Sequence, residues 1–217
     1  CLLSRGLGDV YKRQALRRVE GAFSVVAMTR TKLIGVRDPL GVRPLVLGKI
    51  GDGWALSSET CALDIIGAEF VREIKPGEMV VIQNSGVESH FPFKPQNSRF
   101  CIIEHVYFSR PDSIIGGHSV YETRRQIGVE LAKESPVAAD LVCPVPDSGT
   151  PAAIGFSQES GIPYAMGIIR NQYMGRTFIE PTEQIRNMGV RLKLNVNRAL
   201  IKDLSLIHIS EPTRQEA

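Results

Sequence analysis

The first half of the chain alternates short apolar runs with clusters of turn-forming residues. Turn-forming residues recur about every 8 to 12 positions, for example at residues 38–41, 51–53 and 84–86. This pattern is typical of short antiparallel strands joined by tight turns, and it predicts an antiparallel layer. The predicted strands cover residues 22–28, 32–36, 44–47, 54–57, 78–83 and 86–91.

A short helix is predicted between these strands. Ser57 or Ser58 can cap a helix that begins near Glu59. Its apolar residues would pack on the strand layer, so the local class is α+β; they are Ala62, Leu63, Ile65 and Ile66.

The periodicity changes after Pro95, where helical spacing begins. Ser119 and Glu122 have the spacing of a capping box, which starts a helix by satisfying its first backbone amides. The helix then carries one apolar stripe, formed by Val120, Ile127 and Leu131.

A strand–helix–strand unit follows this helix. Residues 140–145 form a short apolar run, Thr150 and Pro151 open a helix that ends near Ser160, and residues 164–169 form a second apolar run. Short connections between such elements predict a right-handed parallel crossover and hence a doubly wound sheet. Ligands of such sheets bind at the carboxyl ends of the strands, here residues 146–149 and the stretch from Arg170.

The stretch from residue 170 to residue 198 is locally basic. It carries six basic and two acidic side chains, a net charge of +4, whereas the whole chain carries +3. Guanidinium groups match phosphate oxygens in geometry and charge, so the segment is a candidate lid over a phosphorylated substrate. The alternative is a solvated charged face.

Composition narrows the class of protein. The 217 residues are 43% hydrophobic and 23% charged, which is ordinary for a globular protein and excludes disordered, collagen-like and coiled-coil chains. The near balance of charge argues against general attraction to nucleic acid or membranes. Without an apolar run of roughly 18 residues or a secretory signal, we expect a soluble cytoplasmic protein.

The four cysteines are far apart and form no CxxC pair. We therefore expect neither a disulfide framework nor a zinc ribbon, and a reducing compartment fits best. Cys61 and Cys143 have apolar neighbours and are predicted to be packing residues.

Both ends of the chain differ in pattern from what they flank. Residues 1–14 and 204–217 resemble translated linker sequence and are set aside in predicting the fold. An amino-terminal cysteine is the nucleophile of one glutaminase class. Cys1 is followed by Leu-Leu-Ser-Arg rather than by a tight glycine turn, so it is not expected to act as that nucleophile.

Two motifs in the first half resemble a known domain. Residues 36–45 (VRDPLGVRPL) and 56–63 (LSSETCAL) resemble the second half of the amino-terminal-nucleophile domain of glutamine amidotransferases. Asp38 and Arg43 could pair across the turn as a scaffold, the alternative being direct contact with substrate. The family's cysteine nucleophile and Asn-Gly oxyanion donors lie upstream of Glu20 and have no match here.

Three longer motifs resemble the amidophosphoribosyltransferase family. They are FCIIEHVYFSRPDS at 100–113, VPDSG at 145–149 and RNQYMGRTFI at 170–179, and the likeness runs from about Arg17 to Lys202. It implies an α+β partial Ntn-hydrolase glutaminase domain (glutamine amidotransferase type 2) over residues 15–97. An α/β partial type I phosphoribosyltransferase domain would follow over residues 98–203.

The resemblance also implies an activity. In the family, ammonia released from glutamine displaces pyrophosphate from phosphoribosylpyrophosphate (PRPP), whose diphosphate binds Mg²⁺. The product, 5-phosphoribosylamine, begins purine (IMP) biosynthesis, and the enzymes are glycosyltransferases. The implied partners are PRPP, glutamine and further copies of the chain, with no nucleic acid and no membrane.

Site residues follow from the aligned motifs. Residues 170–176 correspond to a loop that orders over PRPP, where Arg176 would contact phosphate and Tyr173 would line the ammonia channel. Arg170 stands where a Lys is common, so a charge is kept, and it is expected to bind substrate. Asp147 and Ser148 would lie near the metal and diphosphate, but Gly149 stands where a hydroxyl residue is common, so no metal ligand is carried over.

Cys101 and His105 stand in the first of these motifs. Cys101 aligns with a ligand of a 4Fe-4S cluster in some relatives. His105 has apolar neighbours and is predicted to pack rather than to act as a base.

One family feature has no match. The transferase fingerprint is an apolar strand ending in two acidic residues, and the sequence contains no Asp-Asp pair. We therefore expect neither glutaminase nor transferase activity from the 217-residue chain alone. Two alternatives stay open: another glutamine amidotransferase, related to glucosamine-phosphate synthase or asparagine synthetase, and a non-catalytic binder of phosphate or nucleic acid.

Overall fold

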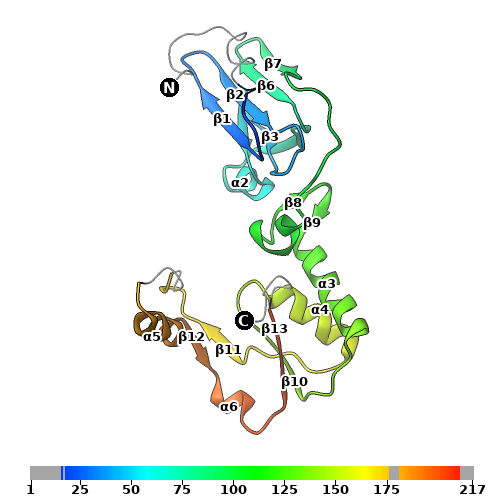
Figure 1. Ribbon diagram of the computed structural model, residues 1–217, viewed down its shortest axis with the longest axis vertical. Coiled ribbons are helices and arrows are strands. Elements are labelled where there is room, and N and C mark those ends of the chain that lie inside the picture. Colours follow the sequence, from blue (N-terminus) through cyan, green and yellow to red (C-terminus); the bar gives the residue numbers. More distant parts are fainter. Residues whose placement is uncertain (1–15, 17, 176–180, 211–217) are drawn as a thin grey trace. The chain divides into compact units, whose positions relative to one another are not determined.

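The chain divides into two compact units. A computed structural model describes residue 16, residues 18–175 and residues 181–210. Unit 1 comprises the chain up to Glu104 together with Phe108–Ser119, and unit 2 comprises His105–Tyr107 and the chain from Val120 onward (Figure 1).

Unit 1 is built from two antiparallel sheets. The first has the strand order β1-β2-β6-β7, with β1 (Ser24–Met28), β2 (Leu33–Arg37), β6 (Met79–Gln83) and β7 (Gly86–His90). The second has the order β4-β3-β5, with β4 (Gly53–Ser57), β3 (Val46–Ile50) and β5 (Glu69–Glu73). The other elements are α2 (Thr60–Ile65) and the hairpin of β8 (Ile114–Ile115) and β9 (His118–Ser119). The π-helical turn η1 (Glu104–Phe108) has its two end residues in unit 1 and His105–Tyr107 in unit 2.

Each of the six predicted strands is present, and one strand was missed. The missed strand is β5, whose sequence EFVRE carries a charge at three of five positions and does not alternate. It becomes a strand because it pairs with β3, through a bulge between Leu47 and Gly48. Pairing with a neighbour, rather than intrinsic propensity, decides its conformation.

Strand β6 connects the two halves of the core of unit 1. Its side chains alternate, so Val80 and Ile82 face one core cluster while Met79 and Val81 face another. The first cluster also takes Leu47 from β3 of the second sheet and Leu45 from the position just before β3, and it lies between the two sheets. Because β6 is apolar on both faces, it is the central buried strand of unit 1.

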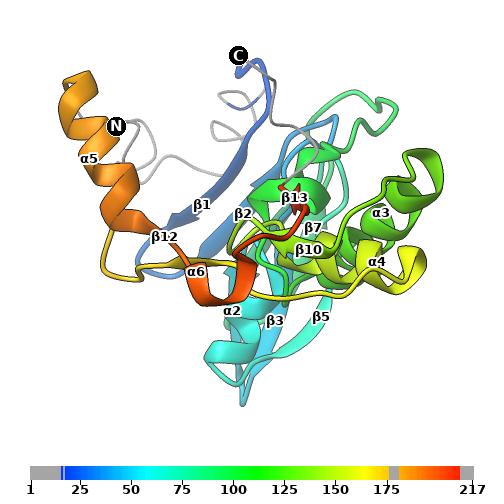
Figure 2. The ribbon, with the colours of Figure 1, turned by 90° about the horizontal axis from the view of Figure 1, so that it is seen from below.

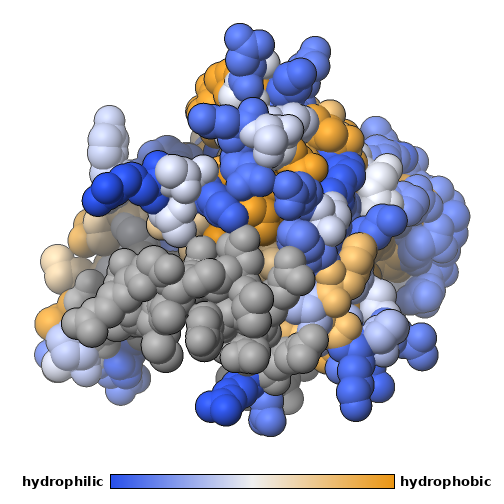
Figure 3. All heavy atoms as spheres, turned by 90° about the horizontal axis from the view of Figure 1, so that it is seen from above, coloured by the Kyte–Doolittle hydropathy of each residue, from blue (hydrophilic) through white to orange (hydrophobic). Residues whose placement is uncertain are grey.

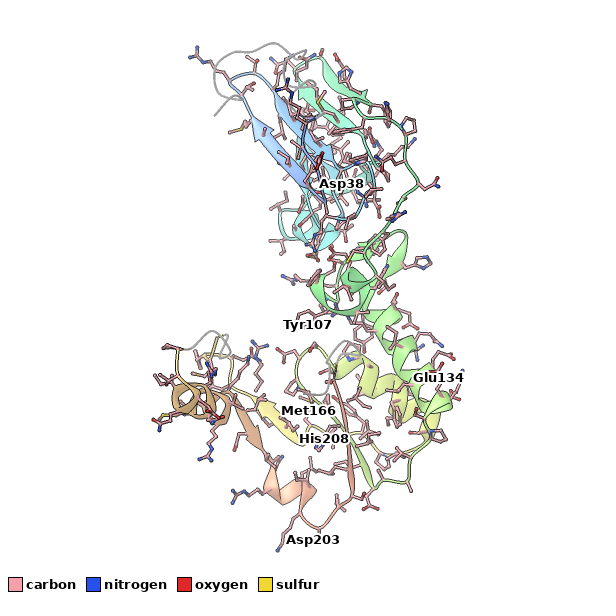
Figure 4. The ribbon with its side chains drawn as sticks, viewed as in Figure 1. Asp38, Tyr107, Glu134, Met166, Asp203 and His208 are labelled. Carbon is pink, nitrogen blue, oxygen red and sulfur yellow. The ribbon has the colours of Figure 1, made fainter. Side chains whose placement is uncertain are left out.

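The turn after β2 is organised by the buried carboxylate of Asp38, within the strands of unit 1 (Figure 4). Asp38 accepts hydrogen bonds from the backbone amides of Leu40 (2.9 Å) and Val42 (3.1 Å). The expected Asp38–Arg43 pair is wrong, since Arg43 pairs with Glu104 instead. A carboxylate inside a tight turn is satisfied most easily by the amides of that turn.

A second buried carboxylate, Glu78, lies between β5 and β7. The Arg72 guanidinium binds both of its oxygens (2.9 and 2.7 Å), and the Ser89 hydroxyl and the Lys75 amide donate to it as well. Burial acts to raise the pKa of Glu78, but these donors outweigh burial and hold the pKa below its ordinary value of 4.5.

Unit 2 contains helices and short strands. They are α3 (Val120–Glu134), β10 (Leu141–Pro144), α4 (Thr150–Ser160), β11 (Ile168–Arg170), α5 (Glu183–Lys193), β12 (Leu194–Val196), α6 (Arg198–Ile201) and β13 (Leu206–Ile209). Helix α4 begins after an N-cap at Gly149, one residue before the predicted cap at Thr150, and ends at the left-handed Gly161. The sequence pattern predicts no helix over the residues of α5 and α6.

Helices α3 and α4 lie side by side because two glycines allow close approach (Figure 2). A Cβ atom on Gly128 of α3 would overlap the backbone of Ala152, and one on Gly155 of α4 would overlap the backbone of Arg125. The helices are therefore in backbone contact. This packing covers the core cluster around Phe156 and Val142.

The predicted parallel pairing across the crossover is confirmed, but it is limited to one bridge. Val142 of β10 makes a parallel bridge to Tyr164, as expected for strand–helix–strand. The predicted second strand over 164–169 is otherwise wrong, because β11 pairs antiparallel with β12 instead. Residues beyond the predicted unit, at 194–196, decide this pairing.

The parallel neighbour of β10 is β13, in a segment that sequence analysis set aside. Leu141–Pro144 pair in register with Leu206–Ile209, and Ile209 is buried in the core of unit 2. The apolar residues at 206, 207 and 209 meet the requirements of a half-buried strand, whatever the origin of this segment.

Apolar side chains also remain exposed. On the face drawn in Figure 3, hydrophobic atoms show between hydrophilic ones. On the edge strand β1, Val26 is 50% and Met28 is 82% exposed. An apolar sheet edge favours association with other chains. Over the described residues, no helix has the length and apolar character that crossing a bilayer requires.

Replacing Glu78 with Gln tests the buried ion pair. The change leaves Arg72 without its partner and is expected to lower the free energy of unfolding by about 2 to 4 kcal/mol at pH 7. Because the folded-state pKa of Glu78 is lowered, its contribution is complete above about pH 4.5 and disappears as the pH falls through that lowered pKa. Urea unfolding of the wild type and the variant between pH 3 and pH 7 measures this, because their unfolding free energies should become equal at the low end of the range. Glu88→Gln, at an exposed position, is the control, and a Glu78→Gln effect independent of pH would contradict the assignment.

Replacing Gly128 with Ala tests the helix contact. The new Cβ must push α3 away from α4, so we expect a loss of about 2 to 3 kcal/mol in unfolding free energy despite the higher helix propensity of alanine. Thermal and urea unfolding followed by circular dichroism measure it. At Gly175 a Cβ meets nothing within 4 Å, so Gly175→Ala is the matched control. Equal behaviour of the two variants would disprove the close contact.

Candidate functional site

The loop that follows β10 is held close to β13. The amide of Val145 donates to the carbonyl of Ile209 (2.7 Å), and the amide of Gly149 donates to the carbonyl of Val145 (3.1 Å). A Cβ at Gly149 would overlap the Ile209 carbonyl, so only glycine fits there. The fixed backbone carries Asp147 and Ser148, two residues singled out from the sequence, at the carboxyl end of β10.

Arg170 of β11 lies against this loop. Its Nη1 atom forms an ion pair with Oδ2 of Asp147 at 2.5 Å. The Nε atom of Arg170 is buried and has no hydrogen-bond partner in the described structure. The two predicted residues therefore meet, and the guanidinium retains donors that the ion pair does not use. Both side chains are partly exposed, at 31% for Arg170 and 58% for Asp147, so a competing anion can reach them.

The loop after Arg170 is a tight turn that presents an aromatic ring. The amide of Tyr173 donates to Oδ1 of Asn171 (3.0 Å), and the amide of Asn171 donates to the carbonyl of Lys193 (2.7 Å). The Tyr173 side chain is 97% exposed. Arg176, predicted to contact phosphate, lies outside the described residues.

The cysteines are in different surroundings. Cys61 and Cys143 are buried, as predicted for packing residues, and Cys101 is partly buried. Within the described part of the chain, no three His, Cys, Asp or Glu side chains come together as a metal site would require. Cys1 lies outside that part.

A buried ionic contact in unit 1 was not predicted. Glu104 is 1% exposed and pairs with Arg43 at 2.6 Å, and it also accepts a hydrogen bond from the Ser109 hydroxyl at 2.7 Å. The Arg43 guanidinium in addition lies over the ring of Phe108, 5.1 Å from its centre. Both charged residues stand inside the recognised motifs, and no spacing rule pairs positions so far apart in the chain.

A second unpredicted contact involves Glu59. Ser57 or Ser58 is predicted to cap α2, but the N-cap is Glu59, whose side chain makes no cap hydrogen bond. The Glu59 carboxylate instead accepts from the Arg110 amide (2.8 Å) and the Ser113 hydroxyl (2.7 Å). The motif at residues 100–113 thus supplies the hydrogen-bond donors for Glu59.

Residues 109–119 make two further contacts with other parts of unit 1. The Thr60 hydroxyl accepts from the Ile114 amide (2.8 Å), and the Glu73 carboxylate accepts from the Gly116 amide (2.6 Å). Together with Glu59, these acceptors hold the segment 109–119 through its backbone.

Comparison with curated proteins gives consistent matches. A model of the glutamine amidotransferase domain family matches residues 3–64. Proteins named amidophosphoribosyltransferase are similar over almost the whole chain. The chain is 55% identical over 202 residues to that of Rhizobium etli, with 91% of this chain and 41% of that protein covered. It is 52% identical over 200 residues to that of Synechocystis sp., with 91% and 40% covered.

Solved structures agree with these relatives. The chain superposes on the structure of the allosteric regulatory enzyme of purine biosynthesis with a TM-score of 0.84 and 42% identity, covering 94% of this chain and 44% of that one. The values for glutamine PRPP amidotransferase from B. subtilis, complexed with ADP and GMP, are the same except that 45% of that chain is covered. The chain belongs to the amidophosphoribosyltransferase family. It spans about two fifths of the length of these curated relatives.

Family membership explains why the recognised motifs meet inside unit 1. The residues that hold one another come from separate motifs: Arg43 from the first, Glu59 from the second, and Glu104, Ser109 and Ser113 from the third. These contacts join the three motifs into one framework within unit 1.

Replacing Arg43 with Met tests that framework. Removal of the guanidinium leaves the buried Glu104 carboxylate with the Ser109 hydroxyl, and we expect a loss of about 2 to 3 kcal/mol of unfolding free energy at pH 7. Urea unfolding measures the loss. The control is Arg110→Met, because the Arg110–Asp112 pair is exposed. A loss no larger than that of the control would show that Arg43 contributes only surface charge.

Proposed function

We propose that the chain is the central part of an amidophosphoribosyltransferase, which makes 5-phosphoribosylamine from PRPP and ammonia derived from glutamine, in the first step of purine biosynthesis. The observation that carries the proposal is 55% identity over 202 residues to a protein of that name. Such identity across both units supports the whole reaction rather than a shared domain alone.

The two units correspond to two partial domains in this proposal. Unit 1, with two antiparallel sheets and a core between them, is the later part of an Ntn-hydrolase glutaminase domain. Unit 2, with α4 between β10 and the parallel bridge at Tyr164, is the first part of a type I phosphoribosyltransferase domain. The match of the glutamine amidotransferase model within residues 3–64 supports the first assignment.

Arg170 and Asp147 form the centre of the proposed PRPP site. Displacement of pyrophosphate builds negative charge on the leaving oxygens, and a guanidinium held in place stabilises that charge. Arg170 is positioned by Asp147 and keeps unused donors, as this role requires. Ser148 would contact the same diphosphate, Arg176 would add a second guanidinium, and the exposed Tyr173 would line the path of ammonia.

We assign Mg²⁺ binding to the diphosphate of the substrate rather than to a set of protein ligands. Mg²⁺ prefers oxygen ligands and keeps several waters, so it would be held by the diphosphate, which would lie near Asp147 and Ser148. A 4Fe-4S cluster requires four thiolates. The described residues place no second or third ligand beside Cys101, so Cys101 could supply one ligand at most and no step is assigned to a cluster.

The proposed enzyme works on small molecules. Its partners would be PRPP, glutamine and other copies of the chain, in the cytoplasm. Cys61, Cys101 and Cys143 are free thiols, which suits a reducing compartment. Two alternatives remain weaker. Another glutamine amidotransferase would not share 55% identity in both units with amidophosphoribosyltransferases. A nucleic-acid binder using residues 170–198 predicts RNA affinity that falls steeply with salt.

Exchange of segments tests the proposal. Residues 15–203 replace the matching segment of the Rhizobium etli relative, and pyrophosphate release is measured with PRPP and glutamine. We expect glutamine-dependent release from the chimera. Arg170→Gln in the chimera should raise the KM for PRPP about tenfold or more, since a charge-assisted hydrogen bond contributes roughly 1.5 to 3 kcal/mol. Arg170→Lys keeps the charge and is the matched control.

Two results would contradict the proposal. One is a folded chimera without glutamine-dependent pyrophosphate release, and the other is equal KM values for the Gln and Lys variants, which would remove Arg170 from the site. The 217-residue chain alone is expected to release no pyrophosphate in the same assay.

A further inference from the structure

The buried thiol of Cys143 bonds to the turn that precedes β11. Cys143, in β10, is 0% exposed. Its Sγ atom accepts a hydrogen bond from the Gly167 amide (3.1 Å) and donates one to the Ala165 carbonyl (3.4 Å). The Gly167 amide also donates to that carbonyl (3.0 Å), so residues 165–167 form a tight turn whose two ends both bond to the thiol. Met166, the middle residue of the turn, lies beside the start of β11 (Figure 4).

Close packing fixes this thiol contact. A Cβ atom on Gly167 would overlap Sγ of Cys143 and would lie 2.8 Å from Cγ2 of Ile201, so no larger residue fits between Cys143 and α6. The Gly167 carbonyl accepts from the amide of Asn197 (2.9 Å), the residue that follows β12. The turn is therefore attached to β10 through the thiol and to the end of β12 through its backbone.

The turn is also the point where the chain exchanges one strand partner for another. Just before the turn, Tyr164 makes its parallel bridge to Val142 of β10. Just after it, β11 pairs antiparallel with β12, and among the described strands β12 is its only partner. The contact of the Cys143 thiol with residues 165–167 therefore links β10 to the strand pair that carries Arg170.

Two chain segments run from the thiol contact to the candidate site. Asp147 follows Cys143 by four residues, and Arg170 follows Gly167 by three. The segments run in the same direction, because the bridge beside the contact is parallel, and they meet again at the 2.5 Å ion pair of Asp147 with Arg170. That pair is partly exposed and holds the segments weakly. A shift of the turn along β10 would therefore move Arg170 away from Asp147 and from the loop that carries it.

We infer that Cys143 is a positioning residue, which holds Arg170 at the diphosphate of the substrate through the turn 165–167. The role rests on the proposed function, because it concerns the same guanidinium. A residue that only fills space can be replaced by any side chain of similar volume. This role instead needs one atom that accepts from the Gly167 amide and donates to the Ala165 carbonyl. Serine keeps both abilities, and alanine keeps neither.

The chimera that contains residues 15–203 provides the first test. Cys143→Ala should raise the KM for PRPP about three- to fivefold and leave kcat within about twofold, because the guanidinium that binds the diphosphate loses its position. Cys143→Ser should restore most of the affinity. In the Arg170→Gln background, Cys143→Ala should not raise this KM further, since effects that act through one shared group are not additive. Cys61→Ala, at a buried cysteine of unit 1, is the matched control and should leave the KM for PRPP unchanged.

A second measurement does not depend on activity. The Nε atom of Arg170 is buried, so in the 217-residue chain its proton should exchange slowly with water and give a nitrogen-proton correlated NMR signal. Cys143→Ala should weaken or remove this signal by opening the site to water, and Cys143→Ser should retain it. The corresponding signal of Arg124, whose buried Nε donates to the His105 carbonyl (2.7 Å), should persist in every variant and shows that unit 2 is folded.

Failure of this role and failure of the proposed function give different results. In a chimera that turns over PRPP and responds to Arg170→Gln, an unchanged KM in Cys143→Ala, or an equal rise in Cys143→Ser, would overturn the role of Cys143 alone. A folded chimera that releases no pyrophosphate would contradict the proposed function. The NMR signal then decides the role, and its persistence in Cys143→Ala would show that Cys143 does not position Arg170.

Discussion

Buried acidic side chains that accept donors from distant loops hold unit 1 together. Glu104 takes Arg43 and Ser109, Glu78 takes Arg72 and Ser89, and Asp38 takes the amides of its own turn. An unpaired carboxylate inside a protein costs several kcal/mol, so each of these residues commits its partners to one position. Several loops between the strands are therefore held by side-chain hydrogen bonds and ion pairs.

In unit 2, glycines rather than buried carboxylates fix the positions of the elements. Gly128 and Gly155 allow α3 and α4 to touch through their backbones, and Gly149 lets the loop after β10 lie against the Ile209 carbonyl. Any side chain at these positions would separate elements that carry the candidate site. The result is a fixed loop that presents Asp147 to Arg170.

Much of unit 1 could be predicted, because its strands alternate strongly and its turns contain typical residues. Strand β5 could not, since EFVRE gains its conformation only from pairing with β3. In unit 2 the parallel relation of β10 and Tyr164 was foreseen, whereas β11 was assigned to the wrong partner. The pairing of β11 depends on residues 194–196, which have no strand signal of their own.

The sequence by itself determined the family, the six predicted strands of unit 1 and the helices α3 and α4, and it singled out Asp147 and Arg170 as candidates, because motifs and periodicity are local properties of a chain. Only the tertiary structure decided that Arg43 pairs with Glu104 rather than Asp38, that Glu59 holds Arg110 and Ser113, and that Arg170 meets Asp147. These contacts join residues far apart in the chain. Their free energy depends on distance and burial, which no local pattern contains.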